Sequence, residues 1–129
     1  MIRHHIIPGL ARPISPSSHA VIVDGWVFMT GQLGRDLDEP DGALFDGITA
    51  QTEQALRNMD RVLQGLGGSL ANLVSVRVFL TEFDRDYAAM NAAYGAFFPV
   101  DARPARTCIG VTGLVKRALV EIDGIARLG

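Results

Sequence analysis

The spacing of apolar residues changes several times along the chain, and these changes limit the folds that it can adopt. Residues 20–23 and 26–30 flank Asp24-Gly25, a strong local signal for a β-hairpin. From Ala55 to Leu66 the apolar residues recur at three- and four-residue spacing, which predicts one face of a long helix ended by a glycine-rich segment. Residues 73–81 then alternate, which predicts a strand with Val74, Val76, Val78 and Leu80 on one face.

The C-terminal third predicts a second helix and two more strands. Asp84 can cap this helix, and its apolar stripe consists of Tyr87, Met90, Tyr94, Phe97 and Phe98. One alternating segment opens at Arg106 and another spans residues 118–126. With residues 4–7 as a short edge strand, the order is β-β-β-α-β-α-β-β. The sequence therefore predicts an α+β fold, with a mixed β-sheet and two helices packed on one face.

The composition of the chain indicates which kinds of binding partner to expect. The 129 residues form one predicted domain, 1–129, with a net charge of −2 and no cluster of Lys and Arg, so no nucleic-acid partner is expected. Hydrophobic residues make up 48% of the chain, which favours a buried oligomer interface, although a dense core is the alternative. The sheet face opposite the helices, which includes Thr107 and Ile109 or their neighbours, is the expected interface of a dimer or trimer.

Several features of the sequence indicate the cellular compartment of the protein. Cys108 is the only cysteine, so no disulfide can form within the chain. Residues 1–8 lack the apolar run of a signal peptide, and no segment has the roughly 20 apolar residues of a membrane span. We expect a cytoplasmic protein with no membrane partner. His4 and His5 are adjacent and lack supporting ligands, so no metal site is expected.

Arg106 and Glu121 are the leading candidates for a site, because both fall in strands predicted to share one sheet. The parallel N–H donors of a guanidinium match the two oxygens of a carboxylate. A glutamate within reach of that guanidinium could hold or activate a water molecule. This pair predicts a site for a small organic acid.

The order of several motifs identifies a family resemblance. Its most specific part is Pro104-Ala-Arg-Thr-Cys108 followed by Glu121-Ile122. The weaker parts are Thr30-Gly-Gln32, Gln51-Thr-Glu-Gln-Ala-Leu-Arg-Asn58, Val78-Phe-Leu-Thr81 and Asn91-Ala-Ala-Tyr94. With these motifs the chain resembles the reactive intermediate deaminase family, the RidA/YjgF group of enamine and imine deaminases.

The resemblance implies a chorismate-mutase-like fold and a homotrimer with clefts between subunits. It also implies hydrolysis of enamines and imines, such as 2-aminoacrylate, to a 2-keto acid and ammonia, without a metal or organic cofactor. Arg106 would anchor the substrate carboxylate, and Glu121 would handle water and protons. The other substrate-binding positions implied are Cys108, through its backbone, and Thr30, Gly31, Asn91 and Ser17.

Departures from the family pattern leave the substrate open. Ser15-Pro16-Ser17 replaces a common tyrosine, Gly110 stands at a frequent glutamate position, and Val115-Lys116 replaces a Pro-Lys turn. A non-catalytic trimer that binds small carboxylates is the main alternative. A ribonuclease or translation inhibitor is a weaker one, because the chain is acidic. Cys108 is expected to be an inert thiol rather than a nucleophile.

Overall fold

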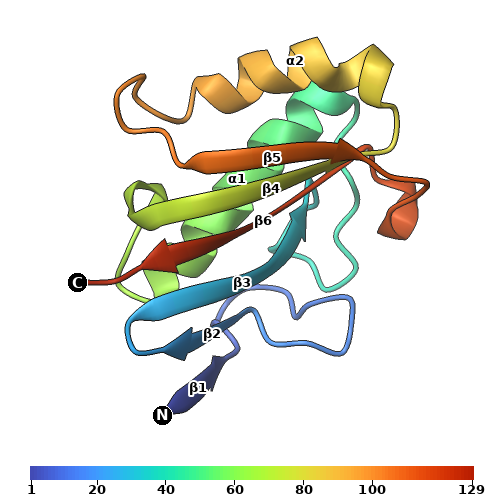
Figure 1. Cartoon of the computed structure of the whole chain (residues 1–129). Coiled ribbons are helices and arrows are strands. Elements are labelled where there is room, and N and C mark those ends of the chain that lie inside the picture. The colour runs from blue at the N-terminus through green and yellow to red at the C-terminus, as the bar shows by residue number, and fades with distance from the viewer.

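The computed structural model describes residues 1–129 and contains the predicted elements in the predicted order (Figure 1). The elements are β1 (Ile2–His5), β2 (Ala20–Val23), β3 (Trp26–Leu33), α1 (Ile48–Gly65), β4 (Leu73–Leu80), α2 (Phe83–Gly95), β5 (Ala105–Gly110) and β6 (Val120–Arg127). Short 3₁₀ turns at Leu70–Asn72 and Val115–Arg117 precede β4 and β6.

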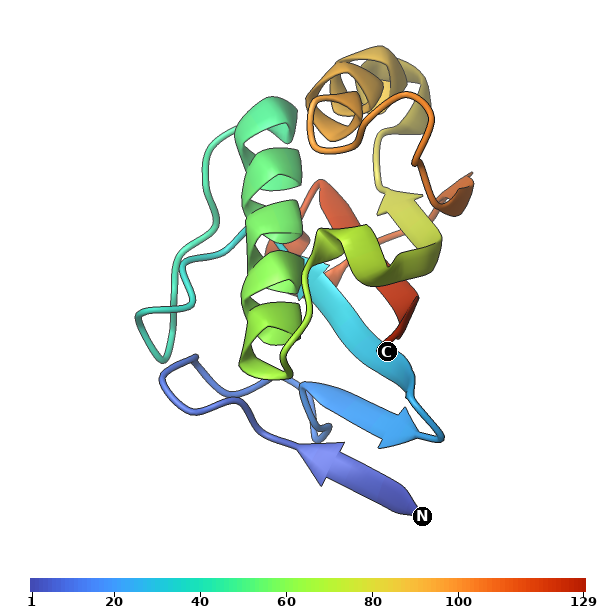
Figure 2. The ribbon, with the colours of Figure 1, turned by 90° about the vertical axis from the view of Figure 1, so that its left-hand side faces the viewer.

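The six strands form one mixed sheet in the order β1-β2-β3-β6-β4-β5. All neighbours are antiparallel except β4 and β5, which α2 connects, because parallel strands need a long crossover. Helix α1 packs against α2, β3 and β6, and α2 also contacts β4. Figure 2 shows the two helices on the same side of the sheet, so the predicted α+β fold is confirmed.

The core lies between the helices and this face of the sheet. The predicted apolar face of α1 is fully buried there through Ala55, Leu56, Met59, Val62 and Leu63. It packs on alternate strand residues that include Val76, Val78, Val120 and Ile122. Truncation of one of these large side chains to alanine costs about 2–5 kcal/mol in a packed core, so this contact fixes the position of α1.

The β2–β3 hairpin was also predicted correctly. Asp24 and Gly25 both have positive φ, at 51° and 81°. A two-residue turn of this kind matches the right-handed twist of the strands that it joins. The turn sets the register in which Val23 faces Trp26.

Four local predictions need correction. Strand β1 begins at Ile2 and not at residue 4. Helix α2 begins after Glu82, which makes no side-chain cap, so Asp84 lies in the first turn instead of capping it. Val74 is exposed because the pairing of β4 with β6 shifts register between Leu73 and Ser75. Tyr87 is 38% exposed and stacks on Phe83 instead of joining the core.

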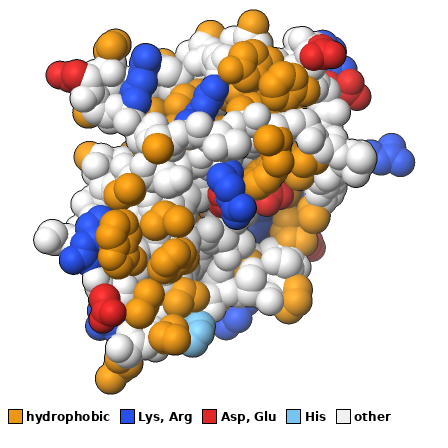
Figure 3. Space-filling model, in the orientation of Figure 1, with side chains coloured by type: hydrophobic (Ala, Val, Ile, Leu, Met, Phe, Trp, Pro, Cys, Tyr) orange, Lys and Arg blue, Asp and Glu red, His pale blue; other side chains and the backbone are white.

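The other face of the sheet has no covering layer within the chain. Trp26, Phe28 and Ile109 are 40–46% exposed on it. Figure 3 looks onto this face and shows hydrophobic side chains gathered over β2 and β3. The sequence predicted an apolar sheet face here, and we call it the open face below. Neither helix has both the length and the apolar character required to cross a membrane.

Candidate functional site

A cavity of about 250 Å³ lies at the end of β3, and we call it the Glu121 cavity. It is bounded by the loop between β1 and β2, by the last residues of β3, and by β6 with the turn before it. Its lining residues are Pro13, Ile14, Ser15, His19, Thr30, Gly31, Gln32, Leu33, Arg35, Val115 and Glu121. Three predicted site residues, Thr30, Gly31 and Glu121, therefore come together here.

Gly31 makes room for the Glu121 carboxylate. A Cβ atom at position 31 would lie 2.2 Å from Glu121 Oε2, closer than side chains tolerate. The register between β3 and β6 shifts here, so that Thr30 and Gly31 both lie opposite Asp123. Bulges of this kind redirect side chains and are common beside active sites.

The Glu121 carboxyl is half-buried, and no protein group donates a hydrogen bond to it. Burial raises its pKa above the ordinary value, and the nearby negative charge of Asp123 raises it further. Burial disfavours the charged form of an acid, so this carboxyl takes up a proton more readily than an exposed glutamate. It is free to bind a water molecule or a substrate nitrogen.

The loop that borders this cavity is held by His19, a buried residue. The backbone N–H of Ile7 donates to His19 Nδ1 at 2.8 Å, and Nε2 bonds the carbonyl of Ala11 at 2.8 Å. These partners require a neutral ring with its proton on Nε2. His19 therefore ties the loop between β1 and β2 together through its two ring nitrogens.

Thr30 and Ser17 have local partners. The Thr30 hydroxyl donates to the Ser18 carbonyl and so joins β3 to the same loop. Ser17 is exposed, bonds the Ser15 hydroxyl at 2.8 Å, and does not line the cavity. Ser15, two residues earlier, is the serine that does.

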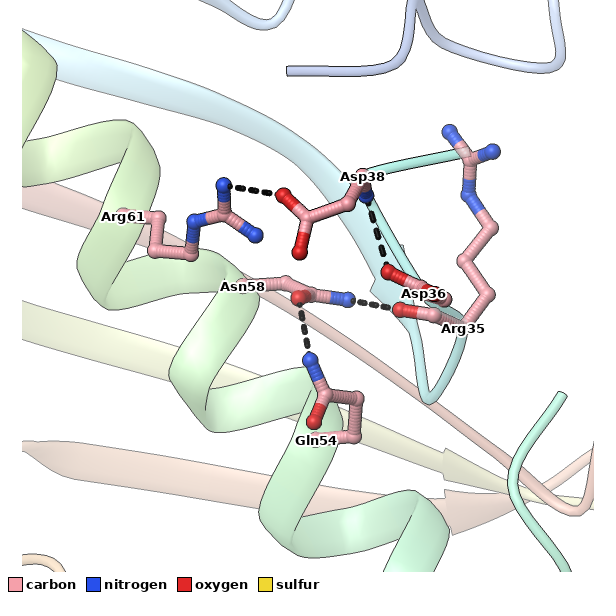
Figure 4. Close-up of polar contacts among 6 residues, drawn as sticks. All are labelled: Arg35, Asp36, Asp38, Gln54, Asn58 and Arg61. Atoms are coloured by element: carbon pink, nitrogen blue, oxygen red, sulfur yellow. Dashed lines mark hydrogen bonds and ion pairs between the residues drawn. The ribbon is translucent and has the colours of Figure 1, made fainter. Parts of the chain in front are cut away.

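Helix α1 fixes the end of β3 on the other side of the cavity. The buried side-chain amide of Asn58 donates to the carbonyls of Leu33 and Arg35, at 3.0 and 2.9 Å. Figure 4 shows Asn58 between Arg35 and Gln54, and the side-chain amide of Gln54 donates to Asn58 Oδ1. Asn58, whose side chain is held by Gln54 one turn earlier, thus holds the backbone at the end of β3.

A second cavity, of about 270 Å³, lies between α2 and β5, and we call it the Arg106 cavity. Its lining residues are Asn91, Tyr94, Gly95, Arg103, Pro104 and Arg106. Arg106 Nη2 donates to Asn91 Oδ1 at 2.7 Å, and the guanidinium carbon lies 4.8 Å from the centre of the Tyr94 ring. No carboxylate forms an ion pair with Arg106. The guanidinium is therefore held in place but retains free donors.

Arg106 and Glu121 do not meet within one chain. Arg106 lies opposite Val76 of β4, whose side chain is in the core under the helices. Glu121 lies opposite Phe79 of the same strand. Residues 76 and 79 are an odd number of positions apart, so their side chains point to opposite faces. For a single chain, the prediction that this guanidinium reaches this carboxylate is wrong.

Cys108 lies on the same face of β5 as Arg106 and packs against the core. Burial raises the pKa of its thiol, and the positive charge of Arg106 opposes that effect. Cys108 lines neither the Glu121 cavity nor the Arg106 cavity. No group of three or more His, Cys, Asp or Glu residues is placed to hold a metal ion.

Four residues that line the Arg106 cavity are not among the predicted site residues, and two of them, Tyr94 and Arg103, have polar side chains. The apolar stripe predicts Tyr94 only as a core residue, although it lies one helical turn after Asn91, on the same face of α2. Arg103 opens the Arg-Pro-Ala-Arg motif. The helical spacing from Asn91 to Tyr94 is the signal that could have found the first.

Comparisons with known proteins cover nearly the whole chain. Residues 10–128 match the family model described as endoribonuclease L-PSP. A RutC family protein of Synechocystis sp. is 37% identical over 116 residues, which are 90% of this chain and 88% of the relative. The crystal structure of RidA from the Antarctic bacterium Psychrobacter sp. superposes with a TM-score of 0.89 at 33% identity, covering 98% of this chain and 100% of that one. TdcF of E. coli with bound serine gives a TM-score of 0.85 at 26% identity, over 97% of this chain and 99% of that one.

Proposed function

Because the chain belongs to the endoribonuclease L-PSP family, in its RidA/YjgF group, we propose that it hydrolyses 2-imino acids and their enamine tautomers to 2-keto acids and ammonia. One observation carries the proposal. The chain presents an oriented guanidinium without a counter-ion and, separately, a carboxylate with a raised pKa and no hydrogen-bond partner. These are the two groups that hydrolysis of a carboxylate-bearing imine requires.

Arg106 is proposed to bind the substrate carboxylate. A guanidinium has five N–H donors, of which Asn91 takes one and the Met90 sulfur, at 3.7 Å from Nη1, engages another weakly. The remaining donors can bind a carboxylate. Tyr94 supports the guanidinium from one side, so little conformational freedom is lost when the ligand binds.

Glu121 is proposed to move the protons. Water attacks the carbon of the protonated imine while Glu121 accepts a proton from the water, which gives a neutral carbinolamine. Glu121 then returns the proton to the nitrogen. The C–N bond breaks and ammonia leaves as the carbonyl forms, and the hydroxyl proton passes to Glu121 and on to the departing ammonia. A carboxyl with a raised pKa is suited to both steps, because it accepts a proton more readily than an exposed glutamate and can still release it to the substrate nitrogen.

The complete site is proposed to form between two copies of the chain, in a homotrimer. The separation of the Arg106 and Glu121 cavities onto opposite faces of the sheet supports this arrangement. Repeated head-to-tail contacts close into a ring, and each contact would join one copy's Arg106 cavity to the next copy's Glu121 cavity. The open face, with Trp26, Phe28 and Ile109 exposed, offers apolar area for such an interface.

The test is pyruvate and ammonia release from 2-aminoacrylate that a dehydratase generates from serine. We expect wild type to accelerate release and Glu121→Gln to abolish the acceleration. Arg106→Ala should raise KM strongly, because removal of one partner of a buried charge pair costs about 2–5 kcal/mol. Arg3→Ala, at an exposed arginine on the far edge strand, is the matched control and should behave as wild type.

Other outcomes point to other functions. Ligand binding that needs Arg106, with no acceleration by wild type on any imine, would contradict the deaminase and favour a carboxylate-binding protein. Although the family model is described as an endoribonuclease, a net charge of −2 without a basic cluster does not favour RNA as a substrate.

A further inference from the structure

The Arg106 cavity contains a second guanidinium, that of Arg103. The Arg103 side chain lies over the end of α2, where its Nη2 would be 3.5 Å from a Cβ placed on Gly95. The ion pairs in the structure join Arg61 to Asp38, Arg77 to Asp123, and Arg85 to Asp86, so neither cavity arginine has an acidic partner. No acidic residue lines the cavity.

Tyr94 provides an independent sign that a polar group is missing here. Tyr94 is 5% exposed, and its hydroxyl has no hydrogen-bond partner. Burial raises the pKa of this hydroxyl, and the charges of Arg106 and Arg103 oppose the rise, so both guanidiniums lie close to it. Buried polar groups in native proteins are normally satisfied, and each exception needs an explanation.

The end of α2 explains the position of Arg103 only in part. A cation is favoured near the C-terminus of a helix, where the free carbonyls carry partial negative charge. However, Arg103 makes no hydrogen bond to those carbonyls or to any other protein group. Its donors, like most of those of Arg106, are available to a ligand.

The charge in the cavity indicates the kind of ligand. Within this cavity a single carboxylate pairs with one guanidinium and leaves the donors of the other free, whereas a ligand with two carboxylates can bind both guanidiniums. We propose that the Arg106 cavity binds two acidic groups at once, and that the chain prefers dicarboxylic 2-imino acids. Arg106 would hold the carboxylate next to the imine carbon, and Arg103 would hold the side-chain carboxylate. The substrate assignment rests on the proposed function, whereas the preference for diacids in binding does not.

The test compares stable keto acids that differ in the second carboxylate. Calorimetric titration with 2-oxoglutarate and 2-oxobutyrate at one ionic strength would use wild type, Arg103→Ala, Arg103→Lys and the exposed control Arg3→Ala. We expect wild type and Arg3→Ala to bind the diacid about tenfold more tightly than the monoacid. Arg103→Ala should abolish this preference and leave 2-oxobutyrate binding within about twofold. Arg103→Lys should keep part of this preference, because lysine retains the positive charge but lacks the planar fork of the guanidinium.

Two results would overturn the inference. One is equal affinity of wild type for the two ligands, and the other is an equal loss of affinity for both in Arg103→Ala. Thermal unfolding of each variant shows whether a loss comes from the fold; Arg103 is exposed, so no change is expected. If Arg103→Ala is destabilised, the same comparison is made with Arg103→Lys.

Activity separates this inference from the proposed function. An amino acid oxidase acting on glutamate or alanine supplies the corresponding dicarboxylic or monocarboxylic imine. Arg103-dependent binding of the diacid without hydrolysis of either imine would support this inference and contradict the deaminase. Hydrolysis of both imines with the same ratio of rates in wild type and Arg103→Ala would support the deaminase and contradict this inference.

Discussion

The orientation of Arg106 depends on two side chains one turn apart on α2. Asn91 accepts a hydrogen bond from Nη2, and the Tyr94 ring lies beneath the guanidinium. The resemblance implied that Asn91 binds substrate, but in the structure its carbonyl oxygen is occupied by Arg106. Asn91 is thus placed to position the anchor.

We predict that Asn91→Ala raises KM for a 2-imino acid about tenfold and leaves kcat nearly unchanged. A hydrogen bond to a charged group contributes about 1.5–3 kcal/mol, and 1.4 kcal/mol corresponds to a factor of ten. Asn91→Asp should impair binding more, because the new carboxylate would pair with Arg106 and compete with the substrate. Steady-state kinetics of both variants checks this, and an unchanged KM in Asn91→Asp would contradict it.

The raised pKa of Glu121 predicts an activity that falls on the acid side at a higher pH than an exposed glutamate allows. The active form as a base is the carboxylate, so kcat/KM should decline as the pH falls through this raised pKa. A profile of kcat/KM against pH measures the midpoint. A midpoint at or below the ordinary value of 4.5 would exclude Glu121 as the group responsible.

The same pKa predicts that Glu121→Gln is more stable than wild type at neutral pH. A raised pKa means that the folded state binds the proton more tightly than the unfolded state, so wild type loses stability as the pH rises through it. The uncharged amide avoids that loss. Urea unfolding from pH 4 to 8 should give Glu121→Gln a higher free energy of unfolding than wild type at neutral pH. This difference should shrink as the pH falls towards 4.5, the ordinary pKa of a glutamate. A gain that is independent of pH would point to packing instead.

At the scale of elements, α1 both supports the core and holds the wall of the Glu121 cavity. Its apolar face packs on the sheet, while Asn58 on the same helix bonds the backbone at the end of β3. The site therefore depends on two hydrogen bonds that Asn58 makes to residues 25 and 23 positions earlier in the chain.

We predict that Asn58→Ala lowers the free energy of unfolding by about 2–4 kcal/mol, because it leaves two carbonyls without donors. Gln54→Ala, which removes only the bond to Asn58 Oδ1, is the matched control and should cost about 1 kcal/mol or less. Chemical denaturation measures both. Equal losses in the two variants would show that the backbone bonds of Asn58 contribute little.

How much the sequence could predict differs between local and long-range features. Asp24-Gly25 and the stripe of α1 depend on nearby residues, and both were predicted correctly. The exposure of Val74 depends on a register shift against β6, a partner some fifty residues away that local spacing does not reveal. Alternation within a strand relates Arg106 only to its near neighbours in β5, and relating Arg106 to Glu121 requires the register of both strands with β4.

At the scale of the whole molecule, the separation of Arg106 from Glu121 can be tested by mixing inactive variants. Equal amounts of the Arg106→Ala and Glu121→Gln variants would be mixed, unfolded together and refolded. If each site takes Arg106 from one copy and Glu121 from the next, about one site in four regains both groups. Activity near a quarter of wild type is expected, and the variants refolded separately serve as controls. No recovery in the mixture would contradict a site formed between copies.

The opposite directions of Arg106 and Glu121 also have a genetic consequence. In the proposed ring every copy serves two neighbouring sites, one through each face of its sheet. A copy that carries both Arg106→Ala and Glu121→Gln would then inactivate both of these sites while leaving the interface intact. Such an allele would act dominantly, and its co-expression with the normal gene should lower activity more than the loss of one gene copy does.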